Sequence, residues 1–285
     1  MTTDTLQRVT RESDLNTAAP RTPGIFLPAL SLARRELVRF LRQRNRIIGA
    51  LATPLIFWLL IGGGMGQSLS FAGMTGDSYI RYFFPGTLVM ILLFTAIFST
   101  ISIIEDRREG FLQSVLVAPV PRSAIVLGKV LGGTVLATGQ GLLFLLLAPL
   151  VGFRFTPASF AITLLLMIVL SFALTALGFC LAWRMTSTQG FHAVMNLFLM
   201  PMWFLSGALF PPSGAWIGLK YVMLVNPLTY GLAGIRRALL LPAPGSLDLP
   251  GPSLPTAIIV SVVFAAVLYW AAGVVARRPS AADLH

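Results

Sequence analysis

Long apolar stretches recur along this 285-residue sequence, and they limit the folds that it can adopt. Each is about 20 residues long, which is the length that an α-helix needs to cross the hydrocarbon core of a bilayer. Charged residues make up only 11% of the chain, whereas a soluble domain carries about 25%. The sequence therefore predicts an all-α polytopic membrane protein with six transmembrane helices. The expected spans are residues 47–65, 83–104, 125–151, 160–183, 191–210 and 256–276.

Lysine and arginine are distributed unevenly between the two sides of these spans. If the N-terminus is cytoplasmic, sixteen of the 21 basic residues lie on the cytoplasmic side and five on the outer side. Because cytoplasmic loops are enriched in lysine and arginine, both termini are predicted to be cytoplasmic, including a C-terminal tail at 277–285. The net charge of +11 then reflects orientation in the cytoplasmic (inner) membrane, and we expect no nucleic acid partner.

The segment before the first span divides into two parts. Residues 1–24 are polar and predict a disordered cytoplasmic tail, whereas residues 25–46 predict an amphipathic interfacial helix that contacts membrane lipids. Its basic face consists of Arg35, Arg39, Arg42 and Arg46. Its apolar face consists of Leu30, Ala33, Leu37, Phe40, Leu41 and Ile48. We expect the arginines to lie near anionic head groups. A simple basic anchor before the first span is the alternative.

The stretch "EDRREGFLQSVLVAPVPR", residues 105–122, lies between the second and third spans. Five consecutive charged residues are followed by a short apolar segment, which ends at Pro119 and Pro121. A helix of this length cannot bury its own apolar face. Such an element is expected either to dock in a groove on a cytoplasmic partner or to lie on the membrane surface.

The region between the fifth and sixth spans, residues 211–255, is too apolar for an ordinary solvated loop. Trp216, Tyr221 and Tyr230 are aromatic residues of the kind that settle at the membrane interface. The stretch "NPLTYGLAGIRRALL" begins with Asn-Pro, which is typical of a helix start. Two short re-entrant helices on the outer side are predicted, and a seventh span is the alternative.

The sequence carries no recognisable catalytic constellation. Gly128–Lys129 is not a phosphate-binding loop, because such a loop has glycine where this chain has Ser123 and Ser or Thr where it has Val130. His192 and Ser206 lie fourteen residues apart on one predicted helix, about 21 Å along its axis, which is too far for a nucleophile and its base. We therefore expect no enzymatic activity and no cofactor in this chain.

Metal binding and ion coupling are also poorly supported. The acidic residues Glu105, Asp106 and Glu109 are interrupted by two arginines, and the single cysteine, Cys180, lies in an apolar run. The predicted span cores contain almost no ionisable residues, which usually mark ion or proton paths. Lys129, in the first turn of the third span, is expected to reach the cytoplasmic surface with its long side chain. No metal site is predicted, and energy for any transport would come from outside this chain.

The stretch "EDRREGFLQSVLVAPVPRSAIVLGKVL" resembles one found in permease subunits of ATP-binding cassette type-2 exporters. The matching positions are Glu105, Arg108, Glu109, Gly110, Leu116, Pro119, Arg122, Gly128 and Lys129. The segment before the last span resembles the same family at Asn226, Pro227, Leu228, Tyr230 and Arg236. The likeness covers nearly the whole chain from about residue 25, and is nearest to daunorubicin-resistance-like drug or lipid exporters and nodulation-type exporters. Phe111, Gln113 and Ser114 stand where many relatives have Thr-Leu-Glu-type residues.

The resemblance implies a homodimer or heterodimer of permease subunits that works with two copies of a separately encoded ATPase. That partner would bind ATP and magnesium. The 105–122 stretch would contain a coupling helix that receives motion from the ATPase. The residues expected to carry this coupling are Glu105, Arg108, Glu109, Gly110, Phe111, Leu112, Val115, Leu116, Pro119 and Arg122. The outer re-entrant region would include Asn226, Pro227, Tyr230 and Arg236.

The second and fifth spans are our hypothesis for the route of a lipophilic substrate. Soft apolar side chains on these spans suit such a substrate, although the same side chains could serve ordinary helix packing. They are Phe94, Phe98, Phe198, Met202 and Phe204. The expected function is ATP-driven export of a drug, lipid or glycolipid. A membrane-embedded enzyme or scaffold protein without an ATPase partner is the alternative.

Overall fold

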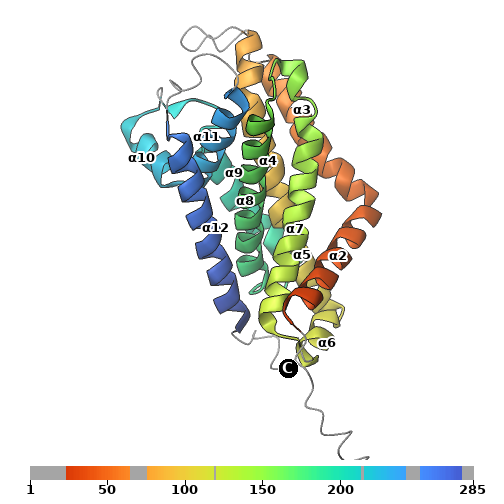
Figure 1. The fold of residues 1–285 in the computed structure, drawn as a ribbon. Coiled ribbons are helices and arrows are strands. Elements are labelled where there is room, and N and C mark those ends of the chain that lie inside the picture. Colours follow the sequence, from red (N-terminus) through yellow and green to blue (C-terminus); the bar gives the residue numbers. More distant parts are fainter. Residues whose placement is uncertain (1–23, 65–75, 119, 213–214, 242–250, 278–285) are drawn as a thin grey trace, which may run out of the picture.

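The computed structural model describes residues 24–64, 76–118, 120–212, 215–241 and 251–277. Every regular element in these ranges is a helix, which confirms the all-α prediction (Figure 1). The elements are α2 (Phe26–Arg42), α3 (Arg44–Gly64), α4 (Gly76–Ser99), α5 (Ile101–Arg108), α6 (Phe111–Val117), α7 (Arg122–Leu145), the 3₁₀ helix η2 (Ala148–Val151), α8 (Pro157–Ala182), α9 (Thr188–Phe204), α10 (Ile217–Val225), α11 (Pro227–Leu240) and α12 (Leu254–Arg277). The predicted tails, apart from Gly24 and Arg277, lie outside the described residues, as does Pro119.

Four helices in the described part of the chain are long and apolar enough to cross a membrane. They are Tyr79–Arg108, which joins α4 and α5, and α7, α8 and α12. The first expected span corresponds to α3, whose apolar part is the shorter segment Leu51–Gly64, and the fifth corresponds to α9, which has 17 residues. The chain is thus a multi-pass membrane protein, and the number six remains a prediction.

The third span is shorter than expected. The sequence predicts a helix to residue 151, but α7 ends at Leu145 and a 3₁₀ turn follows. Pro149 lacks the N–H that an α-helix needs in its interior, and Gly152 adopts the left-handed conformation with φ of 81°. These two residues end the helix and turn the chain towards α8.

Helix α4 forms the centre of the bundle. It packs against α3, α7 and α8, and its residues from Phe83 to Leu93 are almost entirely buried. Near one end, the rings of Phe84 and Phe144 stack at 4.5 Å, and Trp58 meets both rings edge-on at 5.6 Å. Such aromatic pairs stabilise the contact between α3, α4 and α7 beyond the burial of area alone.

Helix α12 covers α8 and leaves an apolar outer face exposed. The exposed side chains on this face are Ile259, Val262, Val263, Val267 and Trp270. A continuous apolar surface of this kind fits contact with lipid rather than water. Helix α12 thus has one face packed against the protein and one apolar face suited to lipid.

Glycines allow α4, α7 and α8 to approach closely. A Cβ atom on Gly133 of α7 would lie 2.4 Å from Ser99 Oγ on α4 and 2.4 Å from Thr175 Cγ2 on α8. A Cβ atom on Gly178 of α8 would lie 2.8 Å from Thr100 Oγ1. Small residues at such contacts are typical of helix packing in membranes, because apolar lipid provides little hydrophobic drive for association.

The two ends of the bundle carry different elements. Figure 1 shows α6 and the beginning of α2 at one end, and α10 and α11 towards the other. The segment after α9 is fastened to α4 by side chains: Tyr79 and Tyr82 donate to the carbonyls of Leu209 and Gly207 at 3.0 and 2.9 Å. Two short helices therefore occupy the predicted outer region, and their re-entrant placement in a membrane remains a prediction.

The close contact at Gly133 generates the first prediction. Gly133→Ala should lower the free energy of unfolding by about 1–3 kcal/mol, because the added methyl group overpacks the contact of three helices. Gly139→Ala on the same helix is the matched control, since a Cβ there has open space. Chemical unfolding in detergent micelles measures both. Equal stability of the two variants would contradict the packing described here.

Candidate functional site

The corner between α5 and α6 is built around one glycine. Gly110 has φ of 76°, a left-handed conformation that residues with a side chain adopt only with strain. It turns the chain between α5 and α6, and the two helices remain in contact. Leu112 points inward and is buried, whereas Val117 is 87% exposed at the far end of α6. The three remaining apolar positions of α6 that the sequence singled out, Phe111, Val115 and Leu116, are half-buried.

A group of charged side chains with a buried centre and a partly exposed rim lies next to this corner and joins three helices. We call it the ionic cluster, and it consists of Arg35, Glu36 and Arg39 on α2, Glu105, Asp106 and Glu109 at α5, and Lys129 on α7. Asp106 is at its centre and is fully buried. Lys129 pairs with Asp106 and donates to Glu36 Oε1 at 2.6 Å. These contacts connect α5, α7 and α2 through one ammonium group.

The arginines of α2 complete the ionic cluster from its open side. Arg35 donates to both oxygens of Asp106, at 2.8 and 3.0 Å, in a two-pronged arrangement. Arg39 donates to Asp106 at 2.8 Å and pairs with Glu105 at 3.0 Å and Glu109 at 3.2 Å. Two-pronged pairs between guanidinium and carboxylate are among the stronger and more directional hydrogen bonds. The hydrogen bonds to Asp106 raise the pKa of Arg35 above its ordinary value, which favours the charged guanidinium.

The position of Lys129 corrects one expectation from the sequence. The prediction that this side chain reaches the cytoplasmic surface is wrong, because its residue is only 4% exposed. Its ammonium group instead lies between Glu36 and Asp106, with Ser102 Oγ at 3.2 Å. A buried ammonium needs such partners, since an unpaired charge in the interior is very costly.

Two glycines explain how α2 reaches this buried lysine. A Cβ on Gly128 would lie 2.7 Å from the carbonyl oxygen of Ala29, and one on Gly132 would lie 2.9 Å from the Cβ of Glu36. The absence of side chains at these two positions lets the backbone of α2 lie against α7. The Gly128–Lys129 pair therefore has a structural reason. The missing side chain of Gly128 lets α2 pack closely against α7, and Lys129 binds the carboxylate of Glu36 on α2.

Helix α2 is two-sided, but its faces differ from the predicted ones. The expected interfacial helix at 25–46 ends at Arg42, and Arg44 already begins α3. Arg35 and Arg39 face carboxylates where lipid head groups were expected, while Arg42 is exposed. Of the predicted apolar face, Phe40 is buried, Ala33 and Leu37 are half-buried, and Leu30, Leu41 and Ile48 are exposed. The side chain of Arg46 lies outside the described residues.

Arginines on either side of α6 bind the ends of two further helices. Arg107 donates to the carbonyls of Trp183 at 2.8 Å and Met185 at 3.1 Å, just after α8. Arg122 donates to the carbonyls of Ala276 at 3.1 Å and Arg277 at 2.8 Å, at the end of α12. The last carbonyls of a helix lack partners within it, and its negative dipole end attracts a cation. Both ends of the 105–122 stretch are thereby fastened to the bundle.

Most of the residues predicted for coupling lie around the corner between α5 and α6, but they make different kinds of contact. Glu105 and Glu109 pair with Arg39, and Phe111 lies under the guanidinium of Arg35 with 3.6 Å between the guanidinium carbon and the ring centre. Arg108 is exposed. Sequence reasoning missed Glu36, Asp106 and Arg107. Glu36 is the single acidic residue between positions 25 and 46, and that isolation was the available signal.

The outer motif is explained by hydrogen bonds. Asn226 caps α11 by accepting from the N–H of Leu228 at 3.0 Å, and it donates to the carbonyl of Met202 at 2.6 Å. Pro227 occupies the first turn of α11, where its missing N–H costs nothing. Tyr230 donates to the carbonyl of Leu224 at 3.0 Å, and Arg236 donates to that of Gly207 at 3.2 Å. These residues fix α11 against α10 and the end of α9.

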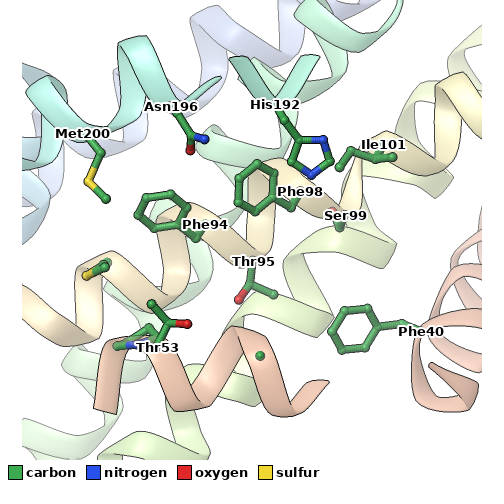
Figure 2. A pocket seen from close by; sticks show the side chains of 13 residues that line it. Phe40, Thr53, Phe94, Thr95, Phe98, Ser99, Ile101, His192, Asn196 and Met200 are labelled. Carbon is green, nitrogen blue, oxygen red and sulfur yellow. The ribbon is translucent and has the colours of Figure 1, made fainter. Parts of the chain in front are cut away.

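A cavity of about 450 Å³ lies between α3, α4 and α9 and extends to Phe40 on α2 (Figure 2). Its lining residues are Phe40, Gly49, Thr53, Pro54, Met90, Phe94, Thr95, Phe98, Ser99, Ile101, His192, Asn196 and Met200. Two of the five predicted route residues, Phe94 and Phe98, belong to this lining. Phe198, Met202 and Phe204 do not, and Phe198 is 65% exposed. The role of all five in a substrate route stays a prediction.

The ionic cluster generates a prediction about stability. Lys129→Met should lower the free energy of unfolding by about 3–5 kcal/mol, because it leaves Asp106 and Glu36 buried without their ammonium partner. The double variant Glu36→Met and Lys129→Met should recover much of this loss, since Asp106 keeps both arginines. Denaturant unfolding of the purified variants measures both effects. A double variant less stable than Lys129→Met would show that the pair is not coupled as described.

Comparison with known proteins agrees with this architecture. The chain matches the family model described as ABC-2 type transporter over residues 29–240. It is 27% identical over 252 residues to the inner membrane transport permease YadH of Escherichia coli strain K12, which covers 84% of this chain and 90% of that protein. It is 27% identical over 235 residues to nodulation protein J of Sinorhizobium fredii, covering 81% of this chain and 86% of that protein. The family model spans more than half of the sequence, and this chain therefore belongs to the ABC-2 type transporter family as a membrane-spanning permease subunit.

Proposed function

We propose that this chain is the permease of an ATP-driven exporter whose ATPase is a separate protein that docks at the corner formed by α5 and α6. The observation that carries the proposal is the ionic cluster beside this corner. Through Asp106 it connects α5 to Lys129 on α7 and to Arg35 on α2. A force applied to α6 would therefore act at once on three helices of the bundle.

The exposed side of α6 is the docking surface in this proposal. Gln113, Ser114 and Val117 are exposed, while Leu112 anchors the helix from its other side. Helix α6 has only seven residues and one buried side chain, so its position is set mainly by the chain segments on either side of it. An apolar side chain as exposed as Val117 is suited to a pocket on a cytoplasmic partner.

Motion at α6 has three paths into the membrane region. The first runs through α5 into α4, which carries Phe94 and Phe98 in the wall of the cavity. The second runs through Arg107 to the end of α8, and the third through Arg122 to the end of α12. Because packed helices have discrete arrangements, we expect a rigid-body change between states rather than gradual bending.

The cavity is the proposed place of the substrate. Its lining combines aromatic and methionine side chains with a few hydroxyl and amide groups, which suits a lipophilic molecule. We propose a homodimer or heterodimer of permeases with two ATPase copies, both termini cytoplasmic, in the cytoplasmic membrane. The excess of basic residues on the side of α6 supports this orientation, and the name of the Escherichia coli relative, an inner membrane transport permease, supports the inner membrane.

Changing the exposed end of α6 tests this proposal. Val117→Asp should abolish co-purification of a co-expressed cognate ATP-binding cassette ATPase and reduce permease-stimulated ATP hydrolysis at least about tenfold, because it places an unpaired charge in an apolar contact. The stability of the permease should not change, since this side chain is 87% exposed. ATPase assays in lipid nanodiscs, with thermal unfolding of the permease alone, measure both quantities.

Val135→Thr, at a half-exposed site in the middle of α7, is the matched control and should leave ATPase binding intact. Full stimulation of ATP hydrolysis by the Val117→Asp permease would contradict α6 as the docking element. If the native permease associates with no ATPase at all, the exporter proposal falls and the membrane enzyme or scaffold becomes the working hypothesis.

A further inference from the structure

One face of α9 presents a regular row of side chains to the cavity. His192, Asn196 and Met200 recur every four residues, so they lie above one another on the helix. Figure 2 shows this row opposite Phe94 and Phe98, which project from α4. The cavity is thus bounded by an aromatic wall on one side and a wall with two nitrogen-bearing groups on the other.

A hydrogen bond to the backbone fixes the orientation of His192. Its Nδ1 lies 2.8 Å from the carbonyl oxygen of Thr188, one turn earlier on α9. A carbonyl oxygen can only accept, so Nδ1 carries the hydrogen of this bond. In the neutral imidazole the other nitrogen, Nε2, is then an acceptor without a hydrogen. The ring also lies against Phe98, with 5.1 Å between the ring centres, so its orientation is held from two sides.

The lining offers few hydrogen-bond acceptors, and His192 is one of them, beside Asn196 and Thr53. None of the lining residues is an acid, a lysine or an arginine among the residues that the structure describes. The hydroxyl of Thr95 pairs with the buried Gln140, and that of Ser99 donates to the carbonyl of Ala96 at 2.7 Å. Figure 2 shows the imidazole ring extending from α9 towards the space beside Phe98 and Ser99.

We infer that the cavity binds an aromatic amphiphile that donates a hydrogen bond from a hydroxyl group to His192 Nε2. Its apolar body would lie between Phe94, Phe98 and Met200. This inference rests on the proposed function, in which the cavity holds the transported molecule. It adds a substrate class, phenols and related alcohols, and makes His192 the residue that determines specificity.

The expected selectivity follows from the geometry. A substrate whose hydroxyl reaches Nε2 gains a hydrogen bond there. An ether of the same shape brings an oxygen lone pair against the lone pair of Nε2 and leaves that nitrogen unpaired. Sites built around a hydrogen bond reject the analogue that lacks the donor more strongly than apolar sites reject a missing methyl group.

Equilibrium dialysis of radiolabelled 2-naphthol and 2-methoxynaphthalene against the permease in lipid nanodiscs tests the inference, with lipid-only nanodiscs subtracted. The native protein should bind 2-naphthol about tenfold more tightly than the ether, the ratio expected for one hydrogen bond. In His192→Phe, which keeps the aromatic contact with Phe98, the ratio should fall to about one. His192→Gln, which restores a side-chain acceptor, should recover part of the preference.

Leu197→Phe on the same helix is the control, because this exposed side chain lies outside the cavity lining and should leave the ratio unchanged. Equal affinity of the two probes for the native protein, or a preference that survives in His192→Phe, would overturn the inference. So would rapid disulfide formation between two copies of an Asn196→Cys, Cys180→Ser permease, since a second copy would then fill the cavity. The dialysis needs no ATPase, so it can fail or succeed independently of the exporter proposal.

Discussion

The buried carboxylate of Asp106 is the group around which the end of the bundle that carries α5 and α6 is organised. Its residue is fully buried, and its charge is balanced by contacts from Lys129, Arg35 and Arg39 on two other helices. An isolated carboxylate could not remain ionised in such a place, so the three helices must stay together for as long as it is charged. Two glycines of α7 let α2 pack closely enough to reach the carboxylate region, and the left-handed Gly110 turns the chain beside it. Close packing and charge pairing thus depend on each other.

Helix α4 connects the two ends of the bundle. Its C-terminal end continues into α5 and the ionic cluster, and its C-terminal half carries the aromatic wall of the cavity. At the other end, the indole of Trp203 on α9 donates to the carbonyl of Gly86 at 2.8 Å, beside the tyrosines that hold the segment after α9. The described core of α4 holds apolar side chains and threonines, which permits rigid movement without exposing charge to lipid. In the proposed exporter, a displacement at α6 would therefore reach the cavity and the segment after α9 through α4.

The sequence predicts much of this architecture because membrane helices leave a strong signal in hydropathy. The positions of α4, α7, α8 and α12 follow from apolar length, and the helix start at Asn226 and Pro227 follows from capping chemistry. Contacts between distant charges leave no such signal. Nothing in the pattern of residues 25–46 shows that Glu36 meets Lys129, 93 positions later. The expectation that Lys129 reaches the surface was wrong for the same reason, since it considered one helix and the lipid but not a neighbouring helix. The cavity at His192 likewise depends on how α9 lies against α4, which periodicity alone does not determine.

Labelling of the cavity during turnover tests most directly whether the ionic cluster transmits motion from α6 to the cavity. An Asn196→Cys, Cys180→Ser permease would be assembled with its ATPase in nanodiscs and labelled with a water-soluble maleimide, with and without ATP and vanadate. In the otherwise native protein, we expect the labelling rate to change when the ATPase is trapped. Adding Glu36→Met and Lys129→Met should reduce that change while ATP hydrolysis continues, because α6 still docks and Arg35 and Arg39 still join α2 to Asp106, but α7 is no longer joined to α5 and α2. An undiminished change in labelling in this variant would contradict the account.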